Sequence, residues 1–537
     1  MFASAALFAS HSVLAEEIIV PSTYDEEAGC LIGDVVALTN AIHNVQENGV
    51  IVLSNGVYDV SFLTNAPSGT YDSNNAGLSL LTSGGKSGVT IRGFTGNPED
   101  VVLDGNGACY RVIALNAANV SLRDLTVRGG NASAKTSNKD NYKNAGGALF
   151  ANGTGGLISN CIFTACSAQK AGGAAGGWYQ TKRGRIMNSL FYGNTCLDNR
   201  GGAIANCSEV IGCTIISNKA TSTSSSNRGG GGLSDCTTVS NCVVAYNYAY
   251  RHGGGVYNCG HVYDSTIEHN VSDQTISGEP CASSGAYLGR YYGCTFRDNC
   301  GGSVCGGVYM ENCTIEDGRV DCATNVNCVF RNLHDTKDHV WAKGNVQYPD
   351  GKSVGTENAF SGIKLMRGCL IENCNWNRDN GAGAVNCSLF YNLDGSVENC
   401  TFVNNQYYLF GRDFESSAVF CNCAILGDGA LFDKDSVNYC FSNCVWTASR
   451  LSSARVEPYV DAKCIELGSN GNPKFVGKGE HPMTPKLTSP LLGAGMVMDW
   501  MTDAVDLAGN PRVRDGKVDI GAYQCWLDPV GFSLRLR

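Results

Sequence analysis

The stretch Cys213-Thr-Ile-Ile-Ser-Asn218 decides the fold of this chain, because its pattern returns along most of the sequence. The pattern is a Cys, an aliphatic or aromatic residue two positions later and an Asn five positions later. Further copies begin at Cys161, where Cys166 takes the Asn position, and at Ser189, Cys242, Ser265, Cys294 and Cys400. Up to Cys294, successive copies lie roughly 23 to 29 residues apart, a period that marks solenoid architectures. The repeat therefore predicts a stack of coils, each burying its apolar face against its neighbours.

A second short pattern indicates the kind of coil. Glycine pairs followed by small or aliphatic residues, as in Gly201-Gly202-Ala203-Ile204 and Gly253-Gly254-Gly255-Val256, precede an Asn-Cys or Gly-Cys strand. Glycine adopts the positive φ angles found at corners, and Asn tolerates the left-handed region. Short strands broken by Gly and Asn fit a β-solenoid better than a helical repeat. We therefore predict an all-β fold of stacked parallel strands.

The repeat also divides the chain into regions. Residues 16–118 are predicted to form an N-terminal cap with the first coils, in which apolar residues at helical spacing indicate a helix over Asp34 to Asn48. A helix there would cover the otherwise open apolar end of the stack. Residues 119–450 carry the coils. Residues 451–537 lack the Cys-to-Asn pattern and hold most of the Pro residues, which predicts a small C-terminal module.

The composition of the 537 residues excludes some functions. A formal net charge of −10 argues against a general nucleic-acid binder, which would carry a basic surplus. No apolar run of about 18 residues is present, so we expect no transmembrane helix. Residues 1–15 are apolar and end at Val13-Leu14-Ala15 before two Glu residues. That arrangement is typical of a signal peptide and its cleavage site, so we expect a secreted or cell-surface protein.

Cysteine is abundant, with 27 residues whose spacing follows the repeat. Stacked in register on parallel strands, neighbouring Cys residues would have Cβ atoms about 4.8 Å apart, whereas a disulfide needs about 3.5–4.5 Å. We therefore predict ladders of buried thiols that act as small apolar fillers. The alternative is a zinc site built from Cys421, Cys423, Cys440 and Cys444. Because Cys423 and Cys444 belong to the ladder, we predict no metal site.

Two resemblances to known families rest on particular motifs. Repeats of chlamydial-type polymorphic outer membrane proteins, which are surface adhesins, contain GGAI and FxxN motifs that resemble Gly201-Gly202-Ala203-Ile204, Phe191-Tyr-Gly-Asn194, Phe296-Arg-Asp-Asn299 and Phe402-Val-Asn-Asn405. The bacterial choice-of-anchor Q region of exported, pectate-lyase-like proteins resembles Ser489-Pro-Leu-Leu-Gly-Ala-Gly495, Asp506-Leu-Ala-Gly-Asn-Pro-Arg512 and Val518-Asp-Ile-Gly-Ala-Tyr523. Both resemblances imply a right-handed parallel β-helix. Neither transfers a catalytic residue.

Enzymes of the pectate-lyase-like fold need clustered carboxylates. Lyases use them to hold Ca²⁺ beside an Arg or Lys base, and hydrolases use a pair for acid and base work. The carboxylates of these repeats are single and fall in different phases: Asp198, Asp235, Asp264, Asp298 and Asp317. We interpret them as solvated turn residues, since turns favour Asp for local hydrogen bonding. We identify no catalytic residue and expect no cofactor; Ca²⁺ would be required only if the protein is a lyase.

Basic residues come just before the glycine pairs of successive coils: Lys170, Arg200, Arg228, Arg251 and His252. They could line one edge and bind an anionic polysaccharide, because Arg fits carboxylate and sulfate geometry; scattered loop charge is the alternative. The second candidate site is a polar excursion that interrupts the repeat and contains His334, Asp335, Lys337, His339 and Trp341. Long excursions from a solenoid often lie on its binding face.

Aromatic residues recur on the same body, among them Tyr287 and Tyr291-Tyr292. Exposed rings could stack on sugars, but we favour core and corner packing, since stacked aromatic rows stabilise sheets. Together these features predict a secreted or surface-displayed bacterial β-helix that binds a polysaccharide or a host or neighbouring cell surface, as adhesins do, and no nucleic acid. The alternatives are a polysaccharide lyase or glycoside hydrolase acting on an anionic polysaccharide, and a purely structural surface-layer component.

Overall fold

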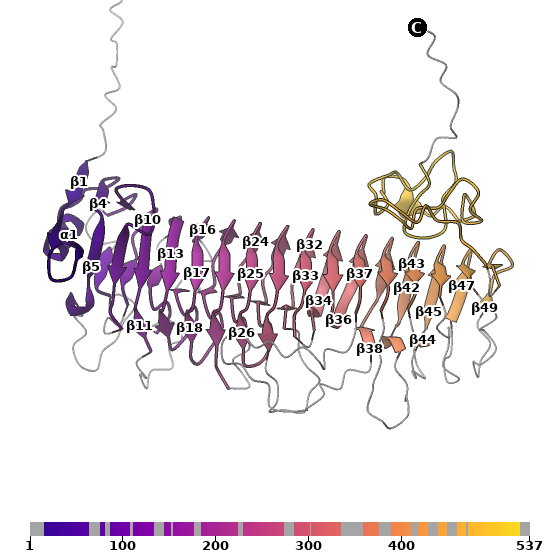
Figure 1. Ribbon diagram of the computed structural model, residues 1–537, viewed down its shortest axis with the longest axis horizontal. Helices are drawn as coiled ribbons and strands as arrows, with labels where there is room; N and C mark the ends of the chain where they lie inside the picture. Colours follow the sequence, from indigo (N-terminus) through magenta and orange to yellow (C-terminus); the bar gives the residue numbers. More distant parts are fainter. Residues whose placement is uncertain are drawn as a thin grey trace, which may run out of the picture. The chain divides into compact units, whose positions relative to one another are not determined.

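The structure is a computed structural model that describes residues 16–63, 76–80, 86–107, 111–133, 144–151, 154–176, 184–223, 229–272, 284–300, 302–333, 358–374, 388–391, 393–405, 408–410, 417–427, 439–447, 459–468 and 471–526. The chain is an all-β, right-handed parallel β-helix, which confirms the predicted fold class. It divides into two compact units, Met1–Asn194 (unit 1) and Thr195–Arg537 (unit 2). Figure 1 shows the strands of each unit standing side by side in successive coils.

Unit 1 begins with a cap. β1 (Glu17–Val20) pairs in parallel with β4 (Val50–Leu53), and between them β2 (Ser22–Asp25) and β3 (Cys30–Gly33) form an antiparallel hairpin. The helix α1 (Val35–Asn44) follows, and its first turn is capped because Asp34 Oδ1 accepts the Ala37 N–H at 2.8 Å. The predicted helix is confirmed, although it ends at Asn44 because Val45 is extended. Its buried residues are Val35, Leu38, Ala41 and Ile42.

The other elements of unit 1 form the first coils, and all their strand pairings are parallel. They are β5 (Gly56–Asp59), the 3-10 turn η1 (Ser61–Leu63), β6 (Leu78–Leu80), β7 (Thr90–Gly93), β8 (Val101–Asp104), β9 (Ile113–Leu115), β10 (Ser121–Arg128), β11 (Asn131–Ala132), β12 (Leu149–Ala151), β13 (Leu157–Thr164), β14 (Ser167–Ala168), β15 (Ala175–Gly176), β16 (Arg185–Met187) and β17 (Leu190–Tyr192).

The coils of unit 2 are built from four rows of parallel strands, which we name A to D. Row A comprises β19 (Ile204–Ala205), β23 (Leu233–Ser234), β27 (Val256–Tyr257), β31 (Ala286–Tyr287), the beginnings of β34 (Val304–Glu311) and β36 (Val320–Val326), β38 (Asn358–Ser361), β41 (Ser388–Tyr391) and β44 (Tyr408–Phe410). Row D is short, with β18 (Thr195–Cys196), β22 (Lys219–Ala220), β26 (Tyr248–Ala249) and β30 (Val271–Ser272).

Rows B and C are the long rows of unit 2. Row B comprises β20 (Glu209–Ile211), β24 (Thr238–Ser240), β28 (His261–Tyr263), β32 (Arg290–Tyr292), the ends of β34 and β36, β39 (Leu365–Arg367), β42 (Gly395–Glu398), β45 (Ala418–Cys421), β47 (Tyr439–Ser442) and β49 (Tyr459–Val460). Row C comprises β21 (Thr214–Ile216), β25 (Val243–Ala245), β29 (Thr266–Glu268), β33 (Thr295–Arg297), β35 (Thr314–Glu316), β37 (Val329–Arg331), β40 (Leu370–Glu372), β43 (Thr401–Val403), β46 (Ala424–Leu426), β48 (Val445–Trp446) and β50 (Ile465–Glu466).

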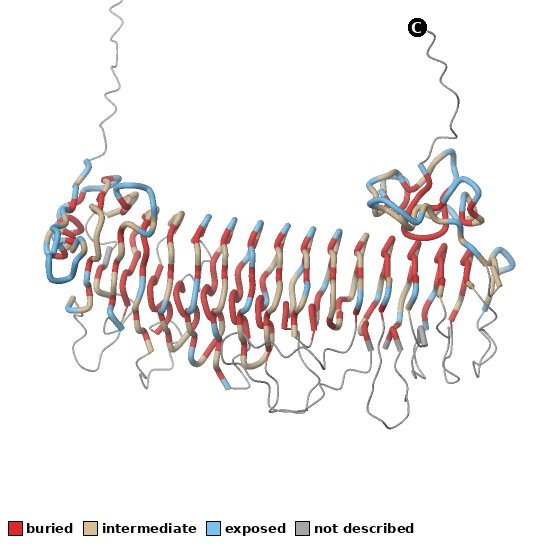
Figure 2. Tube along the Cα trace, in the orientation of Figure 1, coloured by how far each residue is buried: buried red, intermediate tan, exposed pale blue. Residues whose placement is uncertain are grey.

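The core of unit 2 follows from strand alternation. Successive side chains of a strand point to opposite faces, so the middle residue of each three-residue strand in rows B and C points into the coil. Val262 and Tyr291 in row B and Ile267 and Phe296 in row C are completely buried. In Figure 2 buried residues recur along the strands of each coil, and exposed residues gather at many of the corners.

The repeated Asn forms a buried amide ladder at the corner between rows C and D. Asn247 Oδ1 accepts both the backbone N–H and the Nδ2–H of Asn218, each at 3.0 Å. Asn247 Nδ2 donates in turn to Asn270 Oδ1 at 3.1 Å and to the Ile215 carbonyl at 2.9 Å. Asn270 repeats the arrangement with Asn299. The Asn of the sequence pattern therefore binds each coil to the next through its side chain.

The repeated Cys forms a second ladder, at the corner between rows B and C. Neighbouring rungs are in register, and the Cys213 N–H points to Cys242 Sγ at 3.4 Å. Every cysteine that the structure describes is a free thiol, and most of them are buried. The predicted ladder of buried thiols is therefore confirmed. Within the described residues, no group of three or more His, Cys, Asp or Glu is arranged to hold a metal ion.

The module formed by residues 471–526 packs on the outer face of row C within unit 2. The first outward position of row C is a threonine at Thr266, Thr295 and Thr314 and is apolar at Val329, Leu370, Ala424 and Val445, with Thr401 as the one polar residue between Leu370 and Ala424. The module covers these apolar positions in two clusters, which contain Val329, Leu370, Val403, Ala424, Leu426, Val445 and Ile465 from the coils and Leu491, Ile520, Ala522 and Tyr523 from the module. The change in outward residues thus marks where the module binds.

Arg512 and Asn422 make two of the polar contacts between the module and the coils. The Arg512 side chain is fully buried, Nη1 donates to the Gly521 carbonyl at 3.0 Å, and Nη2 donates to Asn327 Oδ1 at 3.4 Å. A Cβ atom at Gly368 would lie 2.1 Å from Arg512 Nη2, so glycine is required at this corner. Asn422 adds a pair of 2.7 Å bonds to the backbone N–H and carbonyl of Met496.

Candidate functional site

The residues of the predicted basic row do not form one aligned row. Lys170 lies in unit 1, and Arg200, Arg251 and His252 lie in unit 2. The pairing of row A aligns Gly201, Gly230 and Gly253, all of which have positive φ. Arg200 and His252 therefore share the position before the aligned glycine, whereas Arg251 lies one position earlier. Outside the described residues lie Arg228 and the predicted loop residues His334, Asp335, Lys337, His339 and Trp341.

Arg200 is paired with a carboxylate. Its Nη1 lies 3.1 and 3.0 Å from the two carboxylate oxygens of Asp235, and the exposed fractions of the two side chains are 34% and 12%. Asp235 also accepts a 2.7 Å bond from Asn258 Nδ2. The interpretation of Asp235 as a solvated turn residue is therefore wrong, because Asp235 is buried between Arg200 of the preceding coil and Asn258 of the following one. An anionic ligand at Arg200 would have to compete with Asp235.

His252 and the neighbouring tyrosines pack against one another. The His252 ring stacks on Tyr287 with a centroid distance of 4.4 Å, and Tyr257 stacks on Tyr287 at 5.6 Å. The Arg200 guanidinium lies over the Tyr257 ring at 5.7 Å. These contacts join successive coils, which agrees with the packing role that the sequence favours for the aromatic residues. The surroundings of Arg200 and His252 are thus largely occupied by the protein itself.

A more open surface lies on row B of unit 2, and we name it the tyrosine face. It consists of His261, Tyr263, Arg290, Tyr292, Tyr309 and Glu311 on β28, β32 and β34. The register places His261, Arg290 and Tyr309 in one line and Tyr263, Tyr292 and Glu311 in a second line. The residues between the lines, Val262, Tyr291 and Met310, are completely buried. Both lines therefore point outward by strand alternation.

The rings of the tyrosine face pack against one another. Tyr263 and Tyr292 are stacked, with centroids 4.9 Å apart and an interplanar angle of 16°, whereas the Tyr309 ring lies 5.6 Å from Tyr292 and is tilted by 38°. His261 lies 6.1 Å from Tyr263. Because the stack uses the ring faces, its outer boundary consists of ring edges and phenol hydroxyls. Each hydroxyl can both donate and accept hydrogen bonds.

Charged groups flank the stack. Arg290 is exposed, and the Tyr309 hydroxyl donates to Glu311 Oε2 at 3.1 Å. Burial and the Glu311 carboxylate raise the pKa of Tyr309 to about 12, so this hydroxyl stays protonated at neutral pH. The face therefore offers phenol hydroxyls, a guanidinium, an imidazole and a carboxylate on neighbouring coils. Such a set can form hydrogen bonds with a polyhydroxylated chain.

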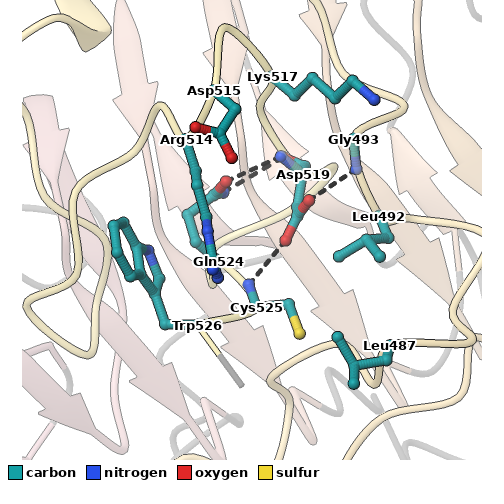
Figure 3. Close-up of a pocket in the computed structure, with 10 residues that line it drawn as sticks. All are labelled: Leu487, Leu492, Gly493, Arg514, Asp515, Lys517, Asp519, Gln524, Cys525 and Trp526. Carbon is teal, nitrogen blue, oxygen red and sulfur yellow. Dashed lines mark hydrogen bonds between the residues drawn. The ribbon is translucent and has the colours of Figure 1, made fainter. Parts of the chain in front are cut away.

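A separate cavity of about 270 Å³ lies in the C-terminal module (Figure 3). Asp519 forms one wall, and its carboxylate oxygens accept the N–H groups of Gly493 and Cys525, each at 2.7 Å. Burial raises the pKa of Asp519, although these backbone N–H groups act in the opposite direction. Arg514 lies over the Trp526 ring at 5.0 Å. Asp519 thus holds the segments that contain Gly493 and Cys525 together. This structural role accounts for the Asp in the Val518–Tyr523 motif.

The sequence contained a signal for the tyrosine face. His261-Val-Tyr263, Arg290-Tyr-Tyr292 and Tyr309-Met-Glu311 each place one buried residue between two outward ones, and each ends two residues before a Cys or Ser of the ladder. Aligning the repeats at that ladder would have placed the triplets side by side. The sequence interpretation aligned the glycine pairs instead, and so it selected the residues around Arg200.

No family model matches the sequence, and no curated protein matches it. Among solved structures, the chain is similar to pectate lyase Pel9A, with 12% identity, 90% of each chain covered and a TM-score of 0.22. It is also similar to the PL6 family alginate lyase AlyGC, with 14% identity over 81% of this chain and 52% of that chain and a TM-score of 0.29. A PL6 alginate lyase in complex with a trisaccharide matches with 12% identity over 87% and 90% of the two chains and a TM-score of 0.29. Likenesses at these values assign no activity to this chain.

Among the described residues, no helix is long and apolar enough to cross a membrane. The expected signal peptide, residues 1–15, lies outside the described residues, so export stays a prediction.

Proposed function

We propose that this protein is an exported β-helix that binds a polysaccharide on its tyrosine face. The observation that carries the proposal is the outward group of neighbouring rings, Tyr263, Tyr292 and Tyr309, with Arg290 beside them. Neighbouring strands hold these groups about 4.8 Å apart. Little side-chain freedom remains to be lost on binding, which lowers the entropic cost of association.

Binding without cleavage is the function that this geometry supports best. A hydrolase needs two carboxyl groups that face each other across the scissile bond. Among the residues that make up the tyrosine face, Glu311 is the one carboxylate, and it accepts the Tyr309 hydroxyl. We therefore propose that the face recognises hydroxyl groups, with Arg290 available for an acidic substituent of the chain.

A polysaccharide lyase is the second candidate. His261 and Arg290 are register neighbours on adjacent strands. A guanidinium could neutralise a uronate carboxylate while an imidazole takes the proton beside it, which is the acid–base work that such an elimination needs. Product analysis separates the two functions, because a lyase releases unsaturated oligosaccharides and a binding protein returns the polysaccharide unchanged.

The test is binding to a panel of neutral and uronate polysaccharides, followed by the variant Tyr292→Ala. We expect wild-type protein to bind at least one member and the variant to bind it about tenfold more weakly, which corresponds to about 1.4 kcal/mol. Tyr459→Ala is the matched control, because Tyr459 lies in the same row B and is 67% exposed. Its affinity should stay within about twofold of wild type.

Three outcomes of this experiment would contradict the proposal. The whole panel could stay unbound, both variants could weaken binding equally, or unsaturated products could accumulate. The last of these would establish the lyase. Circular dichroism spectra and melting temperatures of both variants show whether any loss of binding comes from unfolding instead.

A further inference from the structure

The thiol ladder of unit 2 contains an unbroken run that ends at the last coil. Its rungs directly precede the strands of row C, and all are free thiols. They are Cys294, Cys313, Cys328, Cys369, Cys400, Cys423, Cys444 and Cys464. Before Cys294 the run is interrupted by Ser265, which occupies the same position on the preceding coil.

Neighbouring rungs are in contact. The N–H of Cys423 points to Cys444 Sγ at 3.5 Å, and the N–H of Cys444 points to Cys464 Sγ at 3.4 Å. The thiols of Cys444 and Cys464 also share a hydrogen bond. Cys444 is buried, whereas Cys464 is partly exposed. The run thus has one end that solvent reagents can reach.

The outermost pair of thiols, Cys444 and Cys464, can approach each other more easily than the inner pairs of the run. An inner rung such as Cys423 lies between two neighbours, and parallel pairing on both sides keeps its strand about 4.8 Å from each. A disulfide needs Cβ atoms about 3.5–4.5 Å apart, so an inner bond would distort two coils. In the described part of the chain, β50 pairs with β48 on one edge and with no strand on its other edge. The Cys464 coil can therefore move toward Cys444 without breaking a second pairing.

We propose that Cys444 and Cys464 form an oxidation-dependent disulfide that fixes the last coil of unit 2. With a small-molecule disulfide as the oxidant, Cys464 loses its proton and its sulfur attacks one sulfur of the oxidant. The oxidant's S–S bond breaks, and one small thiolate leaves. The Cys444 thiolate then attacks the Cys464 sulfur, the intramolecular disulfide forms, and the second small thiolate leaves. The two protein thiols supply two electrons to the oxidant and two protons to the released thiolates.

The local environment favours the second step. Burial raises the pKa of Cys444, but hydrogen bonds from the thiols of Cys423 and Cys464 bring it below its ordinary value. Cys444 is thus suited to act as the resolving thiolate. The hydrogen bond with Cys444, together with burial, raises the pKa of Cys464, so its attack on the oxidant is the slow step and needs an alkaline solution. Ile465, next to Cys464, belongs to the apolar cluster that the C-terminal module covers. The disulfide would therefore hold the last strand of row C where the module packs on it.

The test uses the full chain, incubated with oxidised glutathione at a series of alkaline pH values, because the hydrogen bond with Cys444 and burial raise the pKa of Cys464. The protein is then quenched in acid, alkylated, digested without reduction and analysed by mass spectrometry. We expect a linked peptide pair that contains Cys444 and Cys464, and no linked pair from the neighbouring thiols between Cys294 and Cys423. Amide hydrogen exchange of Ile465 to Leu467 should slow by about tenfold in the oxidised protein.

Two variants make the result decisive. Cys464→Ser should abolish the linked pair, whereas Cys294→Ser, at the opposite end of the run, should leave it unchanged. The proposal is contradicted if glutathione stays attached to Cys464 without forming the internal bond. It is also contradicted if inner pairs such as Cys369–Cys400 are linked as often, or if no disulfide forms. Polysaccharide binding is read separately, since none of these residues belongs to the tyrosine face.

Discussion

Asn247→Leu should lower the free energy of unfolding by about 3 kcal/mol or more, the largest loss that we expect from a single change in the coils. Asn247 is completely buried. Its amide satisfies the Asn218 N–H and side chain, the Ile215 carbonyl and Asn270 Oδ1. Leucine has a similar volume but cannot form these bonds, and each buried polar group left unpaired costs about 1–3 kcal/mol. Urea unfolding and hydrogen exchange of the adjacent coils measure the loss.

Asn241→Gly is the control for this ladder prediction. Asn241 is exposed in the same coil, and its φ of 52° is one that glycine adopts freely. We expect this control to change stability by less than about 0.5 kcal/mol. If Asn247→Leu were no more destabilising than Asn241→Gly, the amide ladder would not be what binds successive coils together.

Arg512→Ala should release the C-terminal module from row C, with a loss of about 3–5 kcal/mol. The change removes two hydrogen bonds from a charged donor, each worth about 1.5–3 kcal/mol, and leaves a cavity where a large side chain was. Arg512 contacts Asn327 and Gly521 from a fully buried position. We expect faster proteolysis within residues 471–526 and increased binding of an apolar dye to the uncovered face of row C.

Arg514→Ala provides a matched comparison, because Arg514 lies two residues away and stacks on Trp526 at the edge of the cavity. It should leave the module protected. Gly368→Ala should reproduce the effect of Arg512→Ala from the other side of the contact, since the new Cβ would collide with Arg512 Nη2. Equal protection in Arg512→Ala and Arg514→Ala would show that the Arg512 contact does not hold the module on row C.

Much of the fold was predictable because it depends on local periodicity. The Cys and Asn of each copy lie at corners that must align when coils stack, so their spacing alone predicts parallel strands and side-chain ladders. The cap helix was equally visible, because its apolar spacing and the capping Asp34 lie in one short segment. The ladder of free thiols was predictable because strand spacing sets the distance between the Cβ atoms of stacked cysteines.

The candidate site was less predictable because it depends on register between coils of unequal length. Arg200 meets Asp235 only because row A aligns Ile204 with Leu233, and no local feature of Asp235 reveals that partner. The tyrosine face arises in the same way, from the alignment of Tyr263 with Tyr292. The motif around Arg512 was recognisable, but its contact with Asn327 joins residues 185 positions apart in the sequence.

The most direct test of the proposed function is a crystal structure of the protein soaked with the oligosaccharide that binds best in the panel. We expect the sugar to lie along row B, within hydrogen-bonding distance of the Tyr263, Tyr292 or Tyr309 hydroxyls and of Arg290. A sugar bound instead beside Arg200, or in the cavity near Trp526, with the tyrosine face empty, would contradict the proposal.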